Sequence, residues 1–290
     1  MATDARRRRW RVRGGYDLLW IPVLLFTLGL FVFPLVRLVE LSFTDEAGGG
    51  YTLGWYERVL QQSAYLKVML YTLVVSCVVP LLCLVVSYPV AYVMATARNR
   101  WVAGFLAAMV LVPFTTSVLV KSFAWVALLG EYGIVNRVFV ALHLPGAPYP
   151  LLYNNTGVLL ALTNSLAPFM ILSIYSVLRG IDRNLFKAAA VAGANPFQSF
   201  TRVLLPLSMP GVSAGVLLVF IMTAGTFIVP ALLGGPRQTM VGQLIEDAVQ
   251  STLSYNFASA VSVLLLLATL IVYVSGARVL NLDRIMRIGR

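Results

Sequence analysis

The stretch Lys187-Ala188-Ala189-Ala190-Val191-Ala192-Gly193, followed along the chain by Val203-Leu204-Leu205-Pro206, interrupts a sequence that is otherwise mostly apolar. Alanine is the best helix former, and a glycine at the end of a helix supplies the left-handed stop that many helices use. The stretch therefore predicts a short helix that ends at Gly193, in one of the few hydrophilic gaps of the chain.

The composition places the rest of the chain in a membrane. Apolar residues make up 59% of its 290 residues and charged residues only 11%, whereas soluble domains carry about 45–50% and about 25%. Apolar runs of the roughly 20 residues that a helix needs to cross a bilayer recur along the sequence. We therefore predict an all-α polytopic membrane protein. Its six expected transmembrane helices lie near residues 18–42, 68–95, 102–129, 157–178, 208–233 and 258–279.

Lysine and arginine predict the orientation of these helices. They cluster before the first span, after the second, between the fourth and fifth, and after the sixth. By the positive-inside rule, both termini and the loop 179–206 are cytoplasmic. The expected divisions are a basic tail (1–17), a transmembrane domain (18–280) and a second tail (281–290). The net charge of +11 is then a topology signal and a contact to anionic membrane lipids, and no nucleic-acid partner is expected.

Residues for catalysis are missing from the span interiors. They contain no paired acids, and the lone histidine, His143, together with Cys77 and Cys83, cannot build a metal site. No glycine-rich phosphate loop is present either. We expect no catalytic residue, no metal and no enzymatic activity. A secondary transporter needs ion-coupling groups at mid-membrane, so this class stays a more distant alternative.

The loop 179–206 has the signals of two helices joined by a tight turn. Asp182 is a good N-cap for the first helix, and Gly193 ends it. Asn195 then caps a second helix with Pro196 at its first position, where a missing N–H is harmless. We expect this second helix to end before Pro206, because a proline ring clashes with a continuing turn.

One face of the first helix carries small and apolar side chains, and phenylalanines add aromatic surface to the loop. Such a surface either docks a partner or packs on the protein's own helices, and the residues alone favour neither. The residues concerned are Leu185, Ala188, Ala189 and Ala192 on the helical face, and Phe186, Phe197 and Phe200.

The spacing of this loop resembles that of ABC importer permeases, in which Glu-Ala-Ala precedes a glycine and then Ile-x-Leu-Pro. Ala188, Ala189, Gly193, Leu205 and Pro206 fit this pattern, with Val203 in place of the isoleucine and Lys187 in the glutamate position. The resemblance implies a type I ABC importer permease fold, with a coupling helix in this loop that sits in a groove of an ATPase subunit. The ATPase-coupling residues that it implies are Leu185, Phe186, Lys187, Ala188, Ala189, Ala192, Gly193, Ala194, Pro196 and Phe197.

Other segments are similar to spermidine/putrescine-type permeases, namely 112–114, 121–125, 166–170 and 227–235. This similarity implies a multi-pass protein of the bacterial inner membrane and an importer of several subunits. Its partners would be a second, homologous permease, two copies of an ATPase and a periplasmic or lipid-anchored solute-binding protein. The ATPase would bind ATP and Mg²⁺, and this chain would hold no cofactor.

The substrate is less well specified by the residues. A polyamine is a polycation and favours acids or aromatic faces along its path, yet the spans carry Lys121 and no buried carboxylate. The partner permease could supply the acids, the cavity could leave selection to the binding protein, or the solute could be zwitterionic or anionic. We expect a polyamine-like solute.

Polar and aromatic side chains beside Pro113, Pro168 and Pro230 are the candidates for the substrate path, because helix breaks are tolerated where they line a cavity. The alternative is that they join helices together, and that Lys121 extends to the membrane surface. The predicted path residues are Thr115, Thr116, Trp125, Asn164, Ser165, Thr226 and Phe227.

Overall fold

The computed structural model describes residues 20–45, 50–97, 99–182 and 184–279, which form helices and their connections. The predicted tails, 1–17 and 281–290, lie outside the described residues. Six of the described helical segments are long and apolar enough to cross a membrane, which confirms the predicted fold class. They are Trp20–Ser42, Ser63–Thr96, Val118–Ala141, Asn155–Gly180, Pro196–Ala224 and Tyr255–Gly276.

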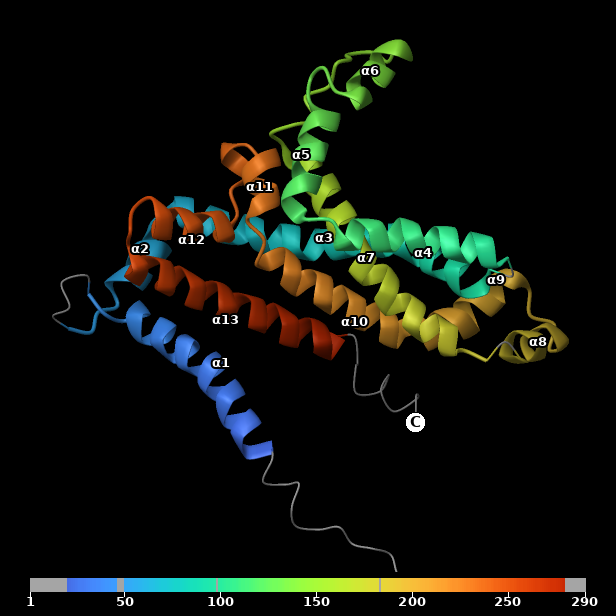
Figure 1. Cartoon of the computed structure of the whole chain (residues 1–290), viewed down its shortest axis with the longest axis horizontal. Coiled ribbons are helices and arrows are strands. Elements are labelled where there is room, and N and C mark those ends of the chain that lie inside the picture. The colour runs from blue at the N-terminus through green and yellow to red at the C-terminus, as the bar shows by residue number, and fades with distance from the viewer. Residues whose placement is uncertain (1–19, 46–49, 98, 183, 280–290) are drawn as a thin grey trace, which may run out of the picture.

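Three long helices form the centre of the bundle. In Figure 1, α3, α7 and α10 run side by side, with α8 at one end of the bundle and α2 and α12 at the other. Of the six long apolar segments, α7 is the most enclosed: 61% of its most apolar 18 residues are buried, against 0% for α1. The helices are α1 (Trp20–Ser42), α2 (Gly54–Gln61), α3 (Ser63–Thr96), α4 (Arg100–Thr115), α5 (Val118–Leu129), α6 (Ile134–Ala141), α7 (Asn155–Gly180), α8 (Asn184–Val191), α9 (Pro196–Ser199), η1 (Phe200–Leu204), α10 (Leu205–Ala224), α11 (Ile228–Leu233), η2 (Pro236–Gln238), α12 (Val241–Gln250) and α13 (Tyr255–Val279).

Small residues allow α7 and α10 to approach closely. A Cβ atom added at Gly211 would lie 2.9 Å from the Ser173 carbonyl oxygen, and one at Gly215 would lie 2.6 Å from the Met170 sulfur. The Ser173 hydroxyl donates a hydrogen bond of 2.9 Å to the Gly211 carbonyl. Glycines spaced by four and hydroxyls at helix contacts are the usual means of packing helices in lipid. This contact fixes α10 against the central helix.

The third and fifth predicted spans are each divided into two helices, as the breaks expected near Pro113 and Pro230 imply. α4 ends at Thr115 and α5 begins at Val118, while α10 ends at Ala224 and α11 begins at Ile228. At the first break, the hydroxyls of Thr115 and Thr116 donate to the Val112 carbonyl at 3.1 and 2.7 Å. These bonds replace backbone bonds that a continuous helix would make.

The prolines break helices less directly than we expected. Pro230 lies in the first turn of α11, where a missing N–H costs no hydrogen bond, so the break comes before it at residues 225–227. α7 runs through Pro168 as one helix. The prediction of a break there was wrong, and the reason is that Pro168 lies in the buried core of the bundle, where packing against neighbouring helices holds α7 together.

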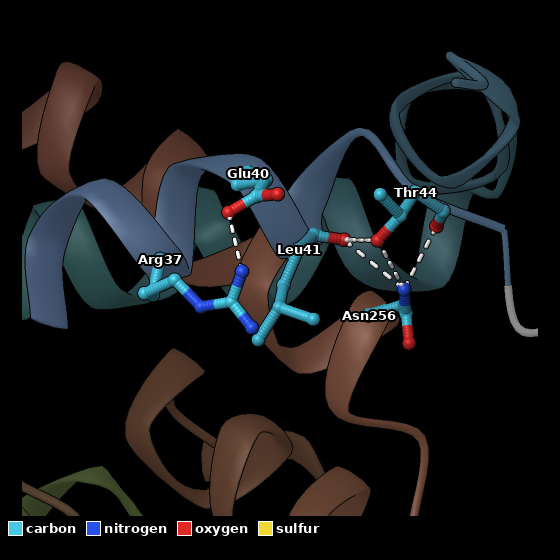
Figure 2. A network of polar contacts seen from close by, with 5 residues as sticks. All are labelled: Arg37, Glu40, Leu41, Thr44 and Asn256. Atoms are coloured by element: carbon cyan, nitrogen blue, oxygen red, sulfur yellow. Dashed lines mark hydrogen bonds and ion pairs between the residues drawn. The ribbon is translucent and has the colours of Figure 1, made fainter. Parts of the chain in front are cut away.

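A polar cluster holds the end of α1 (Figure 2). The Asn256 amide nitrogen lies 2.8 Å from the Thr44 carbonyl oxygen, 2.8 Å from the Thr44 hydroxyl and 3.2 Å from the Leu41 carbonyl oxygen. Arg37 and Glu40 form an ion pair of 2.7 Å nearby. The Leu41 carbonyl at the end of α1 and the Thr44 residue that follows the helix thus share one donor from the start of α13.

Candidate functional site

The first helix of the loop is built by local capping. The Asp182 carboxylate accepts the backbone N–H of Asn184 at 2.9 Å, as an N-cap does. At the other end Gly193 has φ +82°, its N–H donates to Ala190, and the N–H of Ala194 donates to Ala189, each at 3.0 Å. This pair of bonds is a Schellman motif, which confirms the predicted glycine stop.

The second helix begins as predicted but does not end where we expected. Asn195 and Gln198 form a reciprocal capping box, and Pro196 takes the first helical position. The helix then passes through a π-turn, η1, in which the N–H of Leu205 donates to the Phe200 carbonyl, and continues as α10. The wider turn absorbs Pro206, because a π-turn breaks the i→i−4 pattern with which the proline ring would clash. The prediction of an end before Pro206 was therefore wrong.

The outer surface of α8 is exposed. The helix has no buried residue, and Leu185, Ala188 and Ala192 are exposed while Ala189 is half-buried. Val191 is 91% exposed, which leaves a large apolar side chain without cover. Within the described residues, the protein's own helices therefore do not cover this face, which favours the alternative that it docks a partner.

The three phenylalanines of the loop take different positions. Phe197 is 73% exposed and contributes to the surface as expected. Phe186 instead packs against the core and lines a cavity of about 310 Å³ with Tyr92, Tyr175 and other residues. Phe200 packs its ring edge-on against Tyr88, with 5.8 Å between centroids. The expectation that Phe186 adds to the surface was wrong, because the first turn of α8 faces the ends of α3 and α7.

A cavity of about 200 Å³ lies where α4, α5, α7, α10 and α11 meet. It brings together three of the seven predicted path residues, Thr116, Ser165 and Thr226. Lys121 also lines it, as do Phe114 and Phe169, whose ring centroids are 5.0 Å apart. No aspartate or glutamate lines this cavity in the described part of the chain.

The other four predicted path residues lie outside this cavity. Trp125 donates from its indole nitrogen to the Asn164 side-chain oxygen at 3.3 Å and so joins α5 to α7, which is the alternative role named for these residues. Thr115 is exposed and bonded to its own helix, and Phe227 is 41% exposed.

Lys121 lines the cavity but is not among the seven predicted path residues. Its ammonium group donates to the Pro113 carbonyl oxygen at 3.1 Å, and the side chain is half-buried. It therefore points back to the end of α4 rather than extending to the membrane surface. A helix C-terminus carries about −0.5 of an elementary charge, so it attracts a cation and offsets part of its charge. The position of a lysine shortly after a helix break is the signal that could have indicated this role.

Comparison with known proteins identifies the family to which this chain belongs. Residues 87–287 match the family described as binding-protein-dependent transport system inner membrane component. The chain belongs to this family. Membership makes it a multi-pass protein of the inner membrane and the permease component of an ABC importer, which agrees with the six apolar helices.

Relatives within the family are similar over most of the chain. The spermidine/putrescine transport system permease protein PotB of Haemophilus influenzae is 36% identical over 211 residues, covering 72% of this chain and 73% of that protein. PotB of Escherichia coli is 31% identical over 261 residues, covering 87% of this chain and 94% of that protein. A molybdenum transport system permease, ModB of Mycobacterium bovis, is 31% identical over 199 residues, covering 68% and 73%.

Solved permeases share the fold. A chain of a bacterial alginate ABC transporter superposes with a TM-score of 0.72 at 16% identity, covering 91% of this chain and 93% of that chain. A chain of the MetNI methionine ABC transporter gives 0.57 at 20% identity, covering 74% and 94%. These likenesses confirm the type I importer permease fold.

Proposed function

We propose that this permease forms half of the path of an ATP-driven importer for a polyamine-like solute, together with a second, homologous permease. The observation that carries the proposal is the 36% identity with a spermidine/putrescine permease over 72% of the chain. The cavity supports it in size and lining, because hydroxyls and the paired rings of Phe114 and Phe169 suit an amine with an aliphatic chain. A solute-binding protein delivers the solute.

The loop 182–205 is the proposed joint to the ATPase. The importer would contain two copies of the ATPase, which bind ATP and Mg²⁺. One copy would bind the exposed face of α8, and the other would bind the corresponding helix of the second permease. The support is the uncovered surface of Leu185, Ala188 and Val191 beside a conformationally fixed Gly193. Lys187 is exposed on the same helix and has no ion pair within the described residues. We assign it an acidic partner on the ATPase.

Lys121 favours a second candidate, in which the same machine imports a zwitterionic or anionic solute. Its ammonium group lines the cavity without a carboxylate among the described lining residues. The end of α4 offsets part of this charge, which is why the polyamine proposal is preferred. The anionic candidate needs the Lys121 charge to be free for the solute, whereas it is already bonded to Pro113.

The proposal is tested by reconstitution of the permease with its second permease, ATPase and binding protein in proteoliposomes. We expect ATP-dependent uptake of radiolabelled putrescine or spermidine that requires the binding protein. Uptake of an amino acid or an oxyanion in place of the amines would establish the second candidate. A thermal-shift screen of the binding protein with the same solutes gives an independent answer, because the delivered solute raises its melting temperature.

A further inference from the structure

A cavity of about 390 Å³ lies at the end of α5 that is farther from α4. Leu129 at the end of α5, Glu131 and the connection that precedes α7 line it. Leu129 lies about two helical turns beyond Lys121 on the same helix. The cavity is also joined to α11, because the N–H of Tyr153 donates to the Leu233 carbonyl at 2.9 Å. It therefore lies at one end of α5 and α11, the two helices that also line the cavity of about 200 Å³ beside Lys121. Below, the cavity beside Lys121 is called the membrane cavity and the one at Glu131 the outer cavity.

The walls of this outer cavity are fixed by buried hydrogen bonds. The Asn136 side chain is 1% exposed, donates to the carbonyls of Gly130 and Tyr149, and accepts the N–H of Tyr149, at 2.9 to 3.1 Å. The Tyr149 hydroxyl donates to the Pro145 carbonyl at 2.6 Å, and its ring packs edge-on against Phe139. A site whose walls are held in this way is formed before its ligand arrives.

Tyr153 is held in a conformation that tyrosine rarely adopts. Its φ is +60°, in the left-handed region, and its side chain is 63% exposed. Bulky residues are uncommon at positive φ, and strained backbone of this kind concentrates at functional sites. Tyr153 lines the cavity and is mostly exposed, so its side chain is accessible to a ligand there.

The polar chemistry of the cavity suits an ammonium group. Glu131 is exposed and makes no hydrogen bond or ion pair with any residue that the structure describes. A carboxylate that lines the same cavity as Tyr149 and Tyr153 offers an ammonium group a counter-charge together with aromatic side chains. This is the combination that the membrane cavity beside Lys121 lacks.

We propose that the outer cavity binds an ammonium group of the transported amine on its way from the binding protein to the membrane cavity, with Glu131 as its charge partner and Tyr153 as its aromatic wall. This inference rests on the proposed amine import and names a binding site for it. A diamine held at Glu131 would have its second ammonium group free to move along α5.

The test is equilibrium binding of radiolabelled putrescine to the purified complex of permeases and ATPase, without the binding protein. Glu131→Gln keeps the shape of the side chain and removes its charge, so we expect the dissociation constant for putrescine to rise about tenfold or more. Tyr153→Asn removes the ring but tolerates positive φ, and we expect a rise of about threefold to tenfold. The matched control is Glu57→Gln, an exposed acid on α2 that does not line the cavity, which should bind as wild type does.

One result overturns the proposal, namely putrescine binding by Glu131→Gln equal to that of wild type. If this variant also needs a higher concentration of binding protein for half-maximal ATPase stimulation, Glu131 belongs to a docking surface instead. Binding-protein-dependent uptake of putrescine by the wild-type complex tests the proposed function separately. If wild type imports the amine and Glu131→Gln matches it in binding and uptake, only the outer cavity has been assigned wrongly.

Discussion

The ammonium group of Lys121 lies 3.1 Å from the carbonyl oxygen of Pro113, at the point where α4 ends and the chain turns into α5. The charged side chain thereby supplies a hydrogen-bond donor to a carbonyl in the last turn of α4. The bond gives this lysine a structural partner and reduces the charge that a solute meets in the cavity.

Replacement of Lys121 by methionine should leave the Pro113 carbonyl without this donor. A buried carbonyl without a donor costs about 1–3 kcal/mol, and the Pro113 carbonyl is partly buried, so we expect a loss at or below the low end of this range, seen as a lower midpoint of unfolding in detergent micelles and slower uptake. Lys121→Arg keeps a donor and a charge and should stay close to wild type. Equal midpoints for the methionine and arginine variants would show that the bond does not stabilise the break.

Gly193→Val should weaken the association of the permease with its ATPase. Gly193 has φ +82°, and a β-branched residue at positive φ costs about 1–2 kcal/mol, enough to displace the end of α8. No heavy atom lies within 4 Å of a Cβ added there, so the effect is one of backbone conformation alone.

The control for this position is Gly193→Asn, because asparagine tolerates the left-handed region. Co-purification with the ATPase should fall in the order wild type, asparagine, valine. If both variants retain the ATPase and couple ATP hydrolysis to uptake as wild type does, the loop is not the joint. Deletion of residues 185–192 gives the extreme case.

Lys187→Glu should weaken binding of the permease to its own ATPase if an acidic residue faces Lys187. An exposed ion pair contributes about 0.2–1 kcal/mol, so the expected change in dissociation constant is no more than about tenfold. High salt should reduce the difference between variant and wild type. Lys67→Glu on α3 is the control, and an equal effect of both substitutions would point to net charge rather than a specific pair.

Gly211→Ala should destabilise the contact between α7 and α10. The added methyl group would lie 2.9 Å from the Ser173 carbonyl oxygen, which belongs to the backbone and cannot rotate away. We expect a loss of about 1–3 kcal/mol in unfolding free energy. Gly276→Ala on α13 has no atom within 4 Å of its new methyl group and should be neutral or stabilising by up to about 1 kcal/mol.

The sequence predicted the loop in detail because its signals are local. Asp182, Gly193 and Asn195 each act on backbone groups within a few residues, and all three take their expected roles. The inward turn of Phe186 could not be predicted in this way. It depends on where the ends of α3 and α7 lie, which no short segment specifies.

The path residues were harder to predict because a span that is apolar all round does not indicate which face lines a cavity. Thr116, Ser165 and Thr226 meet there, while Trp125 and Asn164 pair with each other outside it. The breaks were also misplaced at Pro168 and Pro230. A proline weakens the turn before it, and whether the helix breaks depends on the groups available to replace the lost bond.

The π-turn at 200–204 has a mechanical consequence. Because it keeps the helix continuous from Pro196 to Ala224, one helical rod runs from the turn after Gly193 almost to Thr226 at the cavity wall. At 1.5 Å per residue the rod is about 43 Å long, and its far end lies roughly 17 Å beyond the midpoint of Gly211 and Gly215, so a tilt of about 5° about that point moves this end by about 1.5 Å. The close contact of Gly211 and Gly215 with α7 lies between the two ends and would serve as the pivot. A small displacement of the loop end of such a lever would move its other end, beside the cavity wall, in the opposite direction.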